Sequence, residues 1–320
     1  MQSMGDDRAK DESTKHTGGR IPGAPGVAAF RVWEEEPSAL PVMISVPHAG
    51  RAYPRSLLRE MRHPDTAALK LEDRYVDTLG KAVAQETGAA LLIAQAPRAM
   101  IDLNRAPEDV DWEMFGRPSR PDDAAAHPSR RARTGLGLIP RRLPGMGELW
   151  RRRHDEQDLT SRIAEIHEPY HARLSSMLAG LRDRWGAALL IDLHSMPPLV
   201  PRSGQAAAEF VIGDRFGTTC HGSLVASAFA QFAQAERRVA HNRPYAGGYV
   251  LERHANPEKG MHAMQIEVDR SCYLDARMFE PGPGLDSVVA VLAGLVRRLA
   301  VGVAELSESD RGSVWPLAAE

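Results

Sequence analysis

The sequence predicts an α/β fold, in which a central mixed, mostly parallel sheet lies between two layers of helices. Short apolar runs typical of buried strands alternate with segments of helical apolar periodicity along the 320 residues. Polar residues follow several of these runs directly, as expected where strands reach the ligand-binding edge of an open sheet. We expect one domain over residues 28–310, because the polar, glycine-rich segment 1–27 has the composition of a disordered region.

The composition is that of an ordinary soluble protein, with 43% hydrophobic and 26% charged residues. The net charge of -2 provides no global basic field, which argues against nucleic acid and acidic membrane surfaces as partners. We expect no apolar run to span a bilayer, and the N-terminus lacks the apolar core of a secretory signal. The two cysteines, Cys220 and Cys272, imply no disulfide framework, so we expect a cytoplasmic protein.

The first part of the domain alternates strand, helix and strand. Residues 41–47 (PVMISVP) form an apolar, β-branched run that predicts a buried strand. Residues 69–87 have helical apolar spacing, and Gly88 suits the C-terminal cap of that helix. Residues 89–94 (AALLIA) predict a second buried strand next to the first.

The middle of the chain is less regular. Residues 106–146 are rich in Arg, Pro, Gly, Asp and Ala, so we expect a long surface excursion, with a lid over the site as a hypothesis. The basic run 151–153 indicates a solvated face, with phosphate or partner binding as the alternative. Helices are predicted over residues 148–185, with a break near Pro169.

The last part of the chain again alternates strands and helices. Strands are predicted at residues 187–193 (AALLIDL), 209–213 (EFVIG) and 263–268 (AMQIEV). A hairpin or strand is expected at 245–253. Helices are predicted at 222–234 and 286–306.

Two histidines are candidate metal ligands because each comes directly after a predicted strand. His48 and His194 then lie at the carboxyl edge of the sheet, and neutral imidazole is a common ligand of Zn²⁺. Glu72 and Asp73, expected to begin the helix after the first strand, could supply a third ligand, and Glu267 on a late strand suits a general base. Histidines after strands are more often structural, and no HExxH or CxxC spacing is present, so both readings stay open.

Two further clusters could bind an anion or a ligand. Arg98, Asn104 and Arg105 follow the second strand, and guanidinium groups bind carboxylates bidentately; a structural pair between Arg98 and Asp102 is the alternative. Residues 241–248 combine polar side chains with two glycines that would permit close backbone approach to a ligand, or else form a surface turn.

Seven segments in one order resemble the N-formylglutamate amidohydrolase family. They are SVPHAGRAYP at 45–54, EDRYVDTL at 72–79, APRAMIDLNRAPED at 96–109, EPYH at 168–171, IDLHSMPP at 191–198, HNRPYAGGYV at 241–250 and MQIEVDRSCYLD at 264–275. The resemblance implies a phosphorylase/hydrolase-like domain similar to zinc carboxypeptidases and to the aspartoacylase and succinylglutamate desuccinylase group.

The resemblance also implies a single zinc ion held by two histidines and one acidic residue. His48 and His194 match the histidine positions. Position 51 is arginine, where the related peptidases keep a glutamate three residues after the first histidine. Asp73 therefore fits best as the acidic ligand, with Glu72 and Asp77 as alternatives. Fe(II), Co(II) or Mn(II) would suit the same ligand set.

Further roles follow from the same resemblance. Asn104 and Arg105 would hold the substrate carboxylate, and Arg98 would face the scissile carbonyl oxygen. Glu267 matches the catalytic glutamate. Arg243 could bind the second carboxylate of an acidic substrate.

The implied activity is zinc-dependent hydrolysis of an acyl amino acid, a small-molecule substrate. N-formyl-L-glutamate is the first choice, giving formate and L-glutamate in histidine degradation. The alternatives are a related enzyme that cleaves another acyl amino acid or a peptide C-terminus, and a non-catalytic zinc or ligand-binding protein. No nucleic acid or membrane is expected as a partner, and the sequence does not fix the oligomeric state.

Overall fold

A computed structural model shows the fold and describes residues 14–117, 130–201 and 206–312. Its centre is a mixed eight-stranded sheet with the order β1-β2-β4-β3-β7-β10-β8-β9. The strands are β1 (Thr14–Gly18), β2 (Phe30–Trp33), β3 (Val42–Val46), β4 (Ala90–Ala94), β7 (Ala188–Met196), β8 (Phe210–Gly213), β9 (Val239–His241) and β10 (Met261–Asp269). The neighbours β4, β3, β7 and β10 are mutually parallel, so their carboxyl ends meet at one edge.

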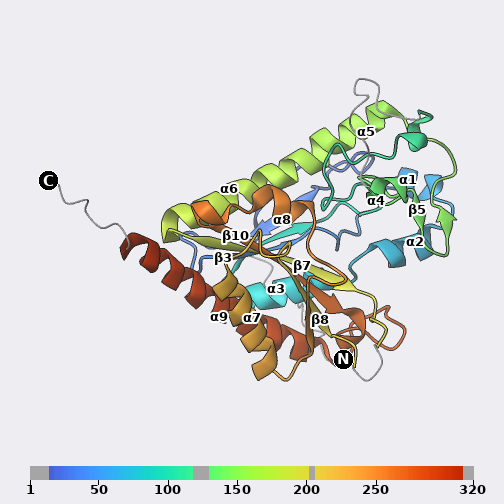
Figure 1. The fold of residues 1–320 in the computed structure, drawn as a ribbon. Helices are drawn as coiled ribbons and strands as arrows, with labels where there is room; N and C mark the ends of the chain where they lie inside the picture. The colour runs from blue at the N-terminus through green and yellow to red at the C-terminus, as the bar shows by residue number, and fades with distance from the viewer. Residues whose placement is uncertain (1–13, 118–129, 202–205, 313–320) are drawn as a thin grey trace, which may run out of the picture.

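Helices cover both faces of this sheet, which confirms the predicted αβα arrangement (Figure 1). On one face lie α5 (Glu156–Arg162), α6 (Glu168–Trp185) and α8 (Tyr249–His254), and on the other lie α3 (Val76–Thr87), α7 (Gly222–Gln234) and α9 (Leu285–Gly312). Shorter elements gather at one end: α1 (Arg55–Glu60), α2 (Pro64–Leu71), α4 (Arg130–Arg133), β5 (Arg142–Leu143) and β6 (Gly147–Glu148).

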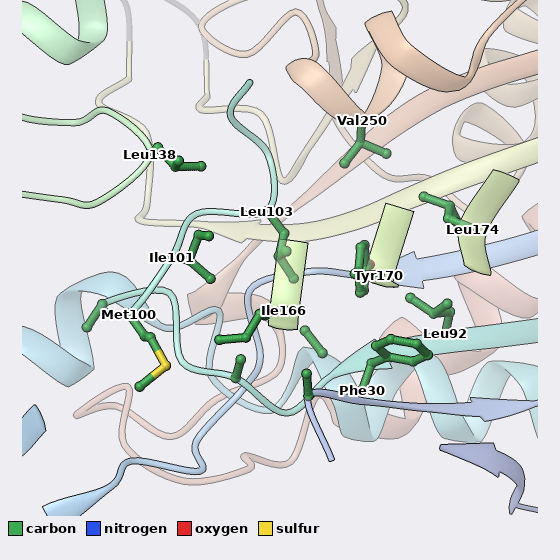
Figure 2. Close-up of a cluster of buried hydrophobic side chains, with 14 of the residues drawn as sticks. Phe30, Leu92, Met100, Ile101, Leu103, Leu138, Ile166, Tyr170, Leu174 and Val250 are labelled. Atoms are coloured by element: carbon green, nitrogen blue, oxygen red, sulfur yellow. The ribbon is translucent and has the colours of Figure 1, made fainter. Parts of the chain in front are cut away.

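Two apolar layers hold the sheet between these helices. On the α6 side, Leu103, Tyr170, Leu174 and Val250 belong to one buried cluster with strand residues such as Leu92 (Figure 2). Burial of such side chains is worth about 1.5–3 kcal/mol each, which is the main force fixing the layers. The second cluster lies on the α3, α7 and α9 side.

Helix α9 is the longest helix of the described chain and contains an apolar stretch, Leu285–Ser307, of 23 residues. Contrary to our expectation, this stretch is long and apolar enough to cross a membrane. In the fold, however, 56% of its most apolar window is buried, and it packs against α3 and α7. Most of its valines and leucines belong to the second apolar cluster, so α9 has the character of a core helix.

The helix expected over residues 69–87 is instead two helices, α2 and α3, joined by a short link. Tyr75 in this link has a left-handed backbone (φ 58°), which interrupts the helix although the apolar spacing continues across it. The backbone N–H of Asp73 donates to the carbonyl of His48 at 2.9 Å. Glu72 and Asp73 therefore lie in the link and do not begin a helix.

Three other expectations need correction. The region 245–253 is a loop followed by α8, not a hairpin or strand. The helix continues past Pro169, because a π-helical turn (Ile163–His167) joins α5 to α6, and the carbonyl of Glu165, four residues before the proline, accepts a hydrogen bond of 2.8 Å from the N–H of Arg20. Strand β7 continues past the predicted end, so His194 lies inside the strand.

The N-terminal segment is also more ordered than expected. Residues 14–18 form β1, which pairs antiparallel with β2, and the side chain of Ile21 is buried. The expectation of disorder over 1–27 is therefore wrong for residues 14–27, whereas 1–13 lie outside the described residues. The helix expected from residue 148 begins only at Glu156 in α5, and Glu148 lies in β6. The remaining predicted strands and helices are confirmed, with small shifts of their ends, and Gly88 caps α3 with a left-handed backbone.

We predict that Leu103→Ala lowers the free energy of unfolding by about 2–5 kcal/mol, because Leu103 is fully buried and its truncation leaves a cavity under α6. Chemical denaturation measures this loss. The control is Val301→Ala on α9, whose side chain is 59% exposed and which should stay within about 0.5 kcal/mol of the wild type. Equal stability of the two variants would contradict this account of the core.

Candidate metal centre and substrate cavity

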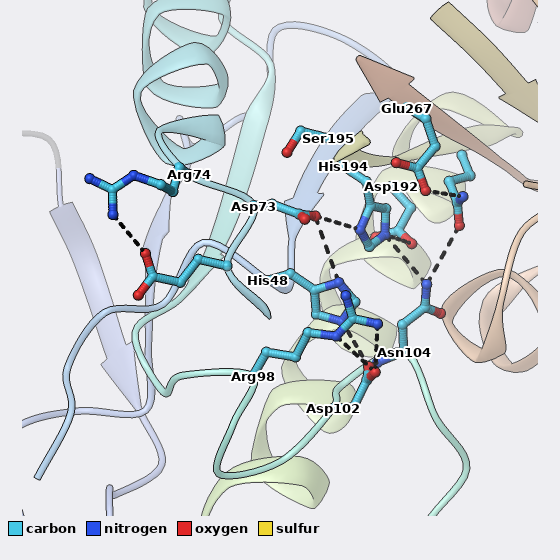
Figure 3. Close-up of polar contacts among 12 residues, drawn as sticks. His48, Asp73, Arg74, Arg98, Asp102, Asn104, Asp192, His194, Ser195 and Glu267 are labelled. Atoms are coloured by element: carbon cyan, nitrogen blue, oxygen red, sulfur yellow. Dashed lines mark hydrogen bonds and ion pairs between the residues drawn. The ribbon is translucent and has the colours of Figure 1, made fainter. Parts of the chain in front are cut away.

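His48, Asp73 and His194 converge at the carboxyl edge of the parallel strands (Figure 3). One ligand atom of each lies within 4.8 Å of the others, and all three residues are buried. Asp73 Oδ2 is 3.0 Å from His194 Nδ1 and 3.7 Å from His48 Nδ1. Two imidazole nitrogens and one carboxylate oxygen form a donor set that could hold a divalent metal ion.

Each histidine has its other ring nitrogen fixed by a buried carboxylate. His48 Nε2 is 2.7 Å from Asp102 Oδ1, and His194 Nε2 is 2.8 Å from Asp192 Oδ2. Because a carboxylate only accepts, each Nε2 carries a proton. A neutral ring then has Nδ1 available as a metal ligand, whereas a protonated ring donates from Nδ1 to Asp73. Asp192 in turn accepts a hydrogen bond of 2.6 Å from Ser45. This arrangement is typical of histidines that bind metals.

The ionisation of the cluster also suits a cation. Burial alone would raise the pKa of Asp73, but hydrogen bonds from His194 and His48 hold this pKa well below its ordinary value. Burial opposes the charged form of His194, yet Asp192 and Asp73 raise its pKa well above the ordinary value. The negative charges of Asp73 and Asp192 therefore favour a positive charge at the position between them.

The neighbouring carboxylates have other partners. Glu72 lies 3.3 Å from Arg74 Nη1, and Asp77 binds Arg51 with a closest distance of 2.8 Å. In Figure 3 the Arg74 side chain points away from the histidines. Of the three acidic residues considered from the sequence, only Asp73 belongs to the group of potential ligands.

Glu267 lies beside this group on the adjacent strand. It pairs in register with His194 across β10 and β7, and Gln265 Nε2 donates to its Oε1 at 2.9 Å. Residues two apart on a strand share a face, so both side chains point to the same side of the sheet. Burial raises the pKa of Glu267 to about 7, although the nearby positive charge of His194 works in the opposite direction. A carboxylate with such a pKa exchanges protons near neutral pH.

In the loop after β4, alternate side chains point into the apolar core and toward the metal-binding group. Ile101 and Leu103 enter the apolar cluster of Figure 2, whereas Asp102 and Asn104 face the histidines in Figure 3. Arg98 contacts Asp102 Oδ2 through Nε at 3.0 Å and through Nη2 at 2.9 Å. The structural pair considered from the sequence is therefore present, and the same aspartate also orients His48.

Asn104 is held by the N-terminus of α8. Its Oδ1 accepts a hydrogen bond of 2.9 Å from the backbone N–H of Val250, while its Nδ2 lies 3.4 Å from His194 Nε2. A Cβ atom on Gly248 would lie only 2.4 Å from Asn104 Oδ1. The glycine thus permits a close approach of backbone to the Asn104 side chain, and Gly247 and Gly248 also line the cavity, where backbone approach to a ligand stays a prediction.

These residues line a cavity of about 170 Å³. Among its lining residues are His48, Asp73, Arg98, Asn104, Arg105, His194 and Glu267. The structure thus brings together every site residue selected from the sequence except one. Arg243 is exposed and does not line the cavity, because the turn that carries it faces outward. Lys70, Arg131 and Arg270 line it instead.

Part of the excursion at 106–146 is joined to the site. The backbone N–H of Asp102 donates to the carbonyl of Leu138 at 2.7 Å, and Arg105 Nε donates to the carbonyl of Leu136 at 3.0 Å. This segment is therefore a fixed wall beside the cavity. Residues 118–129 lie outside the described part of the chain, so the lid remains a hypothesis for them.

Three buried histidines support the loop from the opposite side. His167 Nε2 donates to the carbonyl of Arg105 at 2.9 Å, and His171 Nε2 donates to the carbonyl of Leu103 at 3.0 Å. His171 Nδ1 then accepts from His254 Nε2 at 2.9 Å, so both rings are neutral. Burial lowers the pKa of all three histidines, and that of His254 falls to about 3.

Comparisons with known proteins agree with this geometry. A family model described as N-formylglutamate amidohydrolase matches residues 40–274. The chain belongs to the N-formylglutamate amidohydrolase family. The N-formylglutamate deformylase of Pseudomonas aeruginosa is 30% identical over 245 residues, which cover 74% of this chain and 83% of the relative. That of Pseudomonas putida is 31% identical over 244 residues, covering 74% and 82%.

A solved structure is also similar. The N-formylglutamate amidohydrolase from Ralstonia eutropha JMP134 superposes with a TM-score of 0.73 at 29% identity, and the match covers 90% of this chain and 100% of that chain. The expectation of an enzyme of this amidohydrolase family, which acts on linear amides, is confirmed.

Sequence reasoning overlooked several residues that shape this amidohydrolase site. Asp192 went unnoticed inside an apolar strand, and Asp102 was considered only as a partner of Arg98. Two i, i+2 pairs could have revealed part of the site, because Asp192 precedes His194 and Gln265 precedes Glu267 on one strand face. The cavity also contains Arg131, Lys70 and Arg270. Only the tertiary fold brings these residues to the cavity, and no local sequence pattern indicates it.

We predict that His254→Gln reduces the loss of stability in mild acid. The ordinary histidine pKa of 6.5 applies to the unfolded chain, and the folded value is about 3, so the unfolded state takes up the proton first as pH falls. This contribution to stability is complete above about pH 6.5 and declines toward about pH 3. Between about pH 7.5 and pH 5.5, one such histidine costs about 1.4 kcal/mol, which the neutral glutamine removes.

Urea denaturation at the two pH values measures this difference. The exposed His63, changed to glutamine, is the matched control and should leave the pH dependence as in the wild type. Identical pH dependence in wild type and His254→Gln would show that His254 is not kept neutral by the fold.

Proposed function

We propose that this protein hydrolyses an N-acyl amino acid, with N-formyl-L-glutamate as the first choice, releasing formate and L-glutamate. The observation that supports this most is the buried group His48, Asp73 and His194 next to Glu267, whose pKa near 7 suits proton transfer. The relatives named N-formylglutamate deformylase favour the formyl group and glutamate as substrate parts.

The donor set fits a zinc ion held by His48, Asp73 and His194. Three protein ligands leave a further position of a tetrahedral ion open, which is the arrangement of catalytic sites. The two carboxylates behind the imidazoles add to this fit, because they set the ring orientation that metal binding needs. When bound, the zinc ion supplies Lewis acidity to the amide carbonyl and to the attacking water.

The side chains around this group have complementary roles in the proposal. Glu267 accepts a proton from the attacking water and returns it to the nitrogen of the leaving amino acid. Arg98, held by Asp102, stabilises negative charge on the carbonyl oxygen in the transition state. Arg105 and Asn104 orient the α-carboxylate, which contributes positioning and not bond cleavage.

The size of the cavity favours a small substrate. Its volume is about 170 Å³, below the roughly 300–1,000 Å³ of sites for drug-sized ligands. A single acyl amino acid suits this space better than the C-terminus of a long peptide. The positive residues that line it favour an anionic substrate over a neutral one.

A panel of N-formyl, N-acetyl and N-succinyl amino acids, assayed for freed amine, tests the proposal. The purified protein with measured zinc, iron, cobalt and manganese content should hydrolyse N-formyl-L-glutamate fastest. Faster turnover of another acyl group would assign a different substrate, whereas bound metal without turnover of any compound would indicate a binding protein.

We predict that Glu267→Gln lowers kcat by about 10²–10⁴-fold while metal content stays unchanged, because glutamine cannot accept the proton. The matched control is Glu258→Gln on an exposed turn, which should keep wild-type activity. His194→Ala should lose stoichiometric metal together with activity. Retention of most activity by Glu267→Gln would show that another group acts as the base.

We predict that Asp192→Asn weakens metal binding by about 10–100-fold, because the amide is a poorer partner for the Nε2 proton of His194. Competition with a chelator measures the affinity. Asp183→Asn, at an exposed position on α6, serves as the control. Unchanged affinity in Asp192→Asn would remove this carboxylate from the metal centre.

A further inference from the structure

The cavity has more positive charge than the proposed chemistry uses. Its basic lining residues are Lys70, Arg98, Arg105, Arg131 and Arg270, whereas its acidic ones are Asp73 and Glu267. Buried or partly buried cations in proteins normally have an anionic partner or several hydrogen-bond acceptors. The partners of each cation therefore indicate which of them is available to a substrate.

Two of these arginines are engaged with carboxylates. Arg98 contacts Asp102 through two nitrogens. Arg270 lies 3.4 Å from Asp73 Oδ1 and donates to Ser195 Oγ at 3.1 Å. It also donates to the backbone carbonyls of Leu69 in the last turn of α2 and of Glu72 in the link that follows. The charge of Arg270 therefore stabilises the carboxylate and the link that carries it.

Two further cations donate to backbone carbonyls. Arg105 donates to the carbonyls of Leu136 and Asn104, at 3.0 and 2.7 Å, and remains at the cavity wall. Lys70 Nζ donates to the carbonyl of Pro144 at 3.3 Å from an exposed position on α2. Neither residue is paired with a carboxylate in the part of the chain that the structure describes.

Arg131 on α4 differs from all of these. Within residues 14–117, 130–201 and 206–312, its side chain has no recorded hydrogen bond or ion pair, and it lies exposed at the mouth of the cavity. Its positive charge reaches the site, since it adds to burial and to Arg98 in lowering the pKa of Arg105. An anion between Arg131 and Arg105 would relieve this repulsion.

The backbone around Arg131 is held by hydrogen bonds next to the loop after β4 that carries Asn104 and Arg105. The carbonyl of Arg131 accepts a hydrogen bond of 2.8 Å from the N–H of Leu136, whose own carbonyl binds Arg105. The neighbouring Ala132 is completely buried, which anchors the short helix. Arg131 is thus attached to a fixed wall of the cavity, and its long side chain can reach over the mouth.

We propose that Arg131 binds the side-chain carboxylate of a dicarboxylic N-acyl amino acid while Asn104 and Arg105 bind its α-carboxylate. This inference rests on the proposed function and makes it more specific. It gives Arg131 the role that the sequence had suggested for Arg243, and it explains how the excursion at 106–146 takes part in substrate choice. Arg131 determines specificity and takes no part in bond cleavage.

The test compares N-formyl-L-glutamate with N-formyl-L-glutamine, which differ in charge but hardly in shape. In Arg131→Gln, kcat/KM for the glutamate compound should fall about 10–100-fold, mainly through KM, as expected for loss of one charge-assisted hydrogen bond. For the glutamine compound kcat/KM should stay within about twofold. Arg131→Lys, which keeps the charge, should retain most of the preference.

The matched control is Arg133→Gln, because Arg133 is exposed on the same helix and does not line the cavity. It should keep the wild-type ratio of the two substrates. Near-ultraviolet circular dichroism and metal content of each variant verify that the fold and the metal centre are unchanged.

The outcomes separate this inference from the proposed function. An unchanged substrate ratio in Arg131→Gln overturns the role of Arg131, and a changed ratio in Lys70→Gln would then assign that role to Lys70. Equal hydrolysis of both compounds by the wild type overturns the inference and leaves an N-formyl amidohydrolase. No hydrolysis of either compound by the metal-loaded wild type overturns both.

Discussion

The carboxylate of Asp102 accepts hydrogen bonds from His48 Nε2 and from the backbone N–H of Asn104, and it forms an ion pair with Arg98. One buried charge thereby orients a potential metal ligand, an arginine of the cavity wall and the loop that carries Asn104. A buried carboxylate is costly without such partners, so the three groups stabilise it as much as it orients them. Loss of any one partner would disturb the geometry of the other two, because they share the same two oxygen atoms.

The position of this charge depends on the apolar layer beneath it. The loop after β4 places Ile101 and Leu103 in the core and Asp102 and Asn104 in the site, so packing against α6 fixes the polar groups without any contact to them. His171 adds a hydrogen bond to a carbonyl of the same loop. Hydrophobic burial supplies the stability, and the hydrogen bonds select one conformation from those that the core would allow.

The sequence predicted the layered fold and most of the cavity, because strand and helix periodicities are local and the polar residues after strands had to meet at one edge. Local patterns could not locate the break at Tyr75, since the apolar spacing of a helix continues through it. They also could not exclude Arg243, which is exposed and does not line the cavity. Arg131 comes well after Arg105 in the sequence, and the hydrogen bonds of the Leu136 and Leu138 carbonyls hold its segment against the loop after β4.

The absence of a side chain at Gly248 limits which substitutions related enzymes can accept at this position and at Asn104. A β-carbon there would overlap the amide oxygen of Asn104, so neither position can enlarge while the other stays the same. The two residues lie far apart in the sequence, but a substitution at one of them constrains which residues the other can be. Consider a chimera that takes one of these two residues from a relative in which both positions differ. Its residues 104 and 248 would not fit each other, so it could be inactive although both parent enzymes are active.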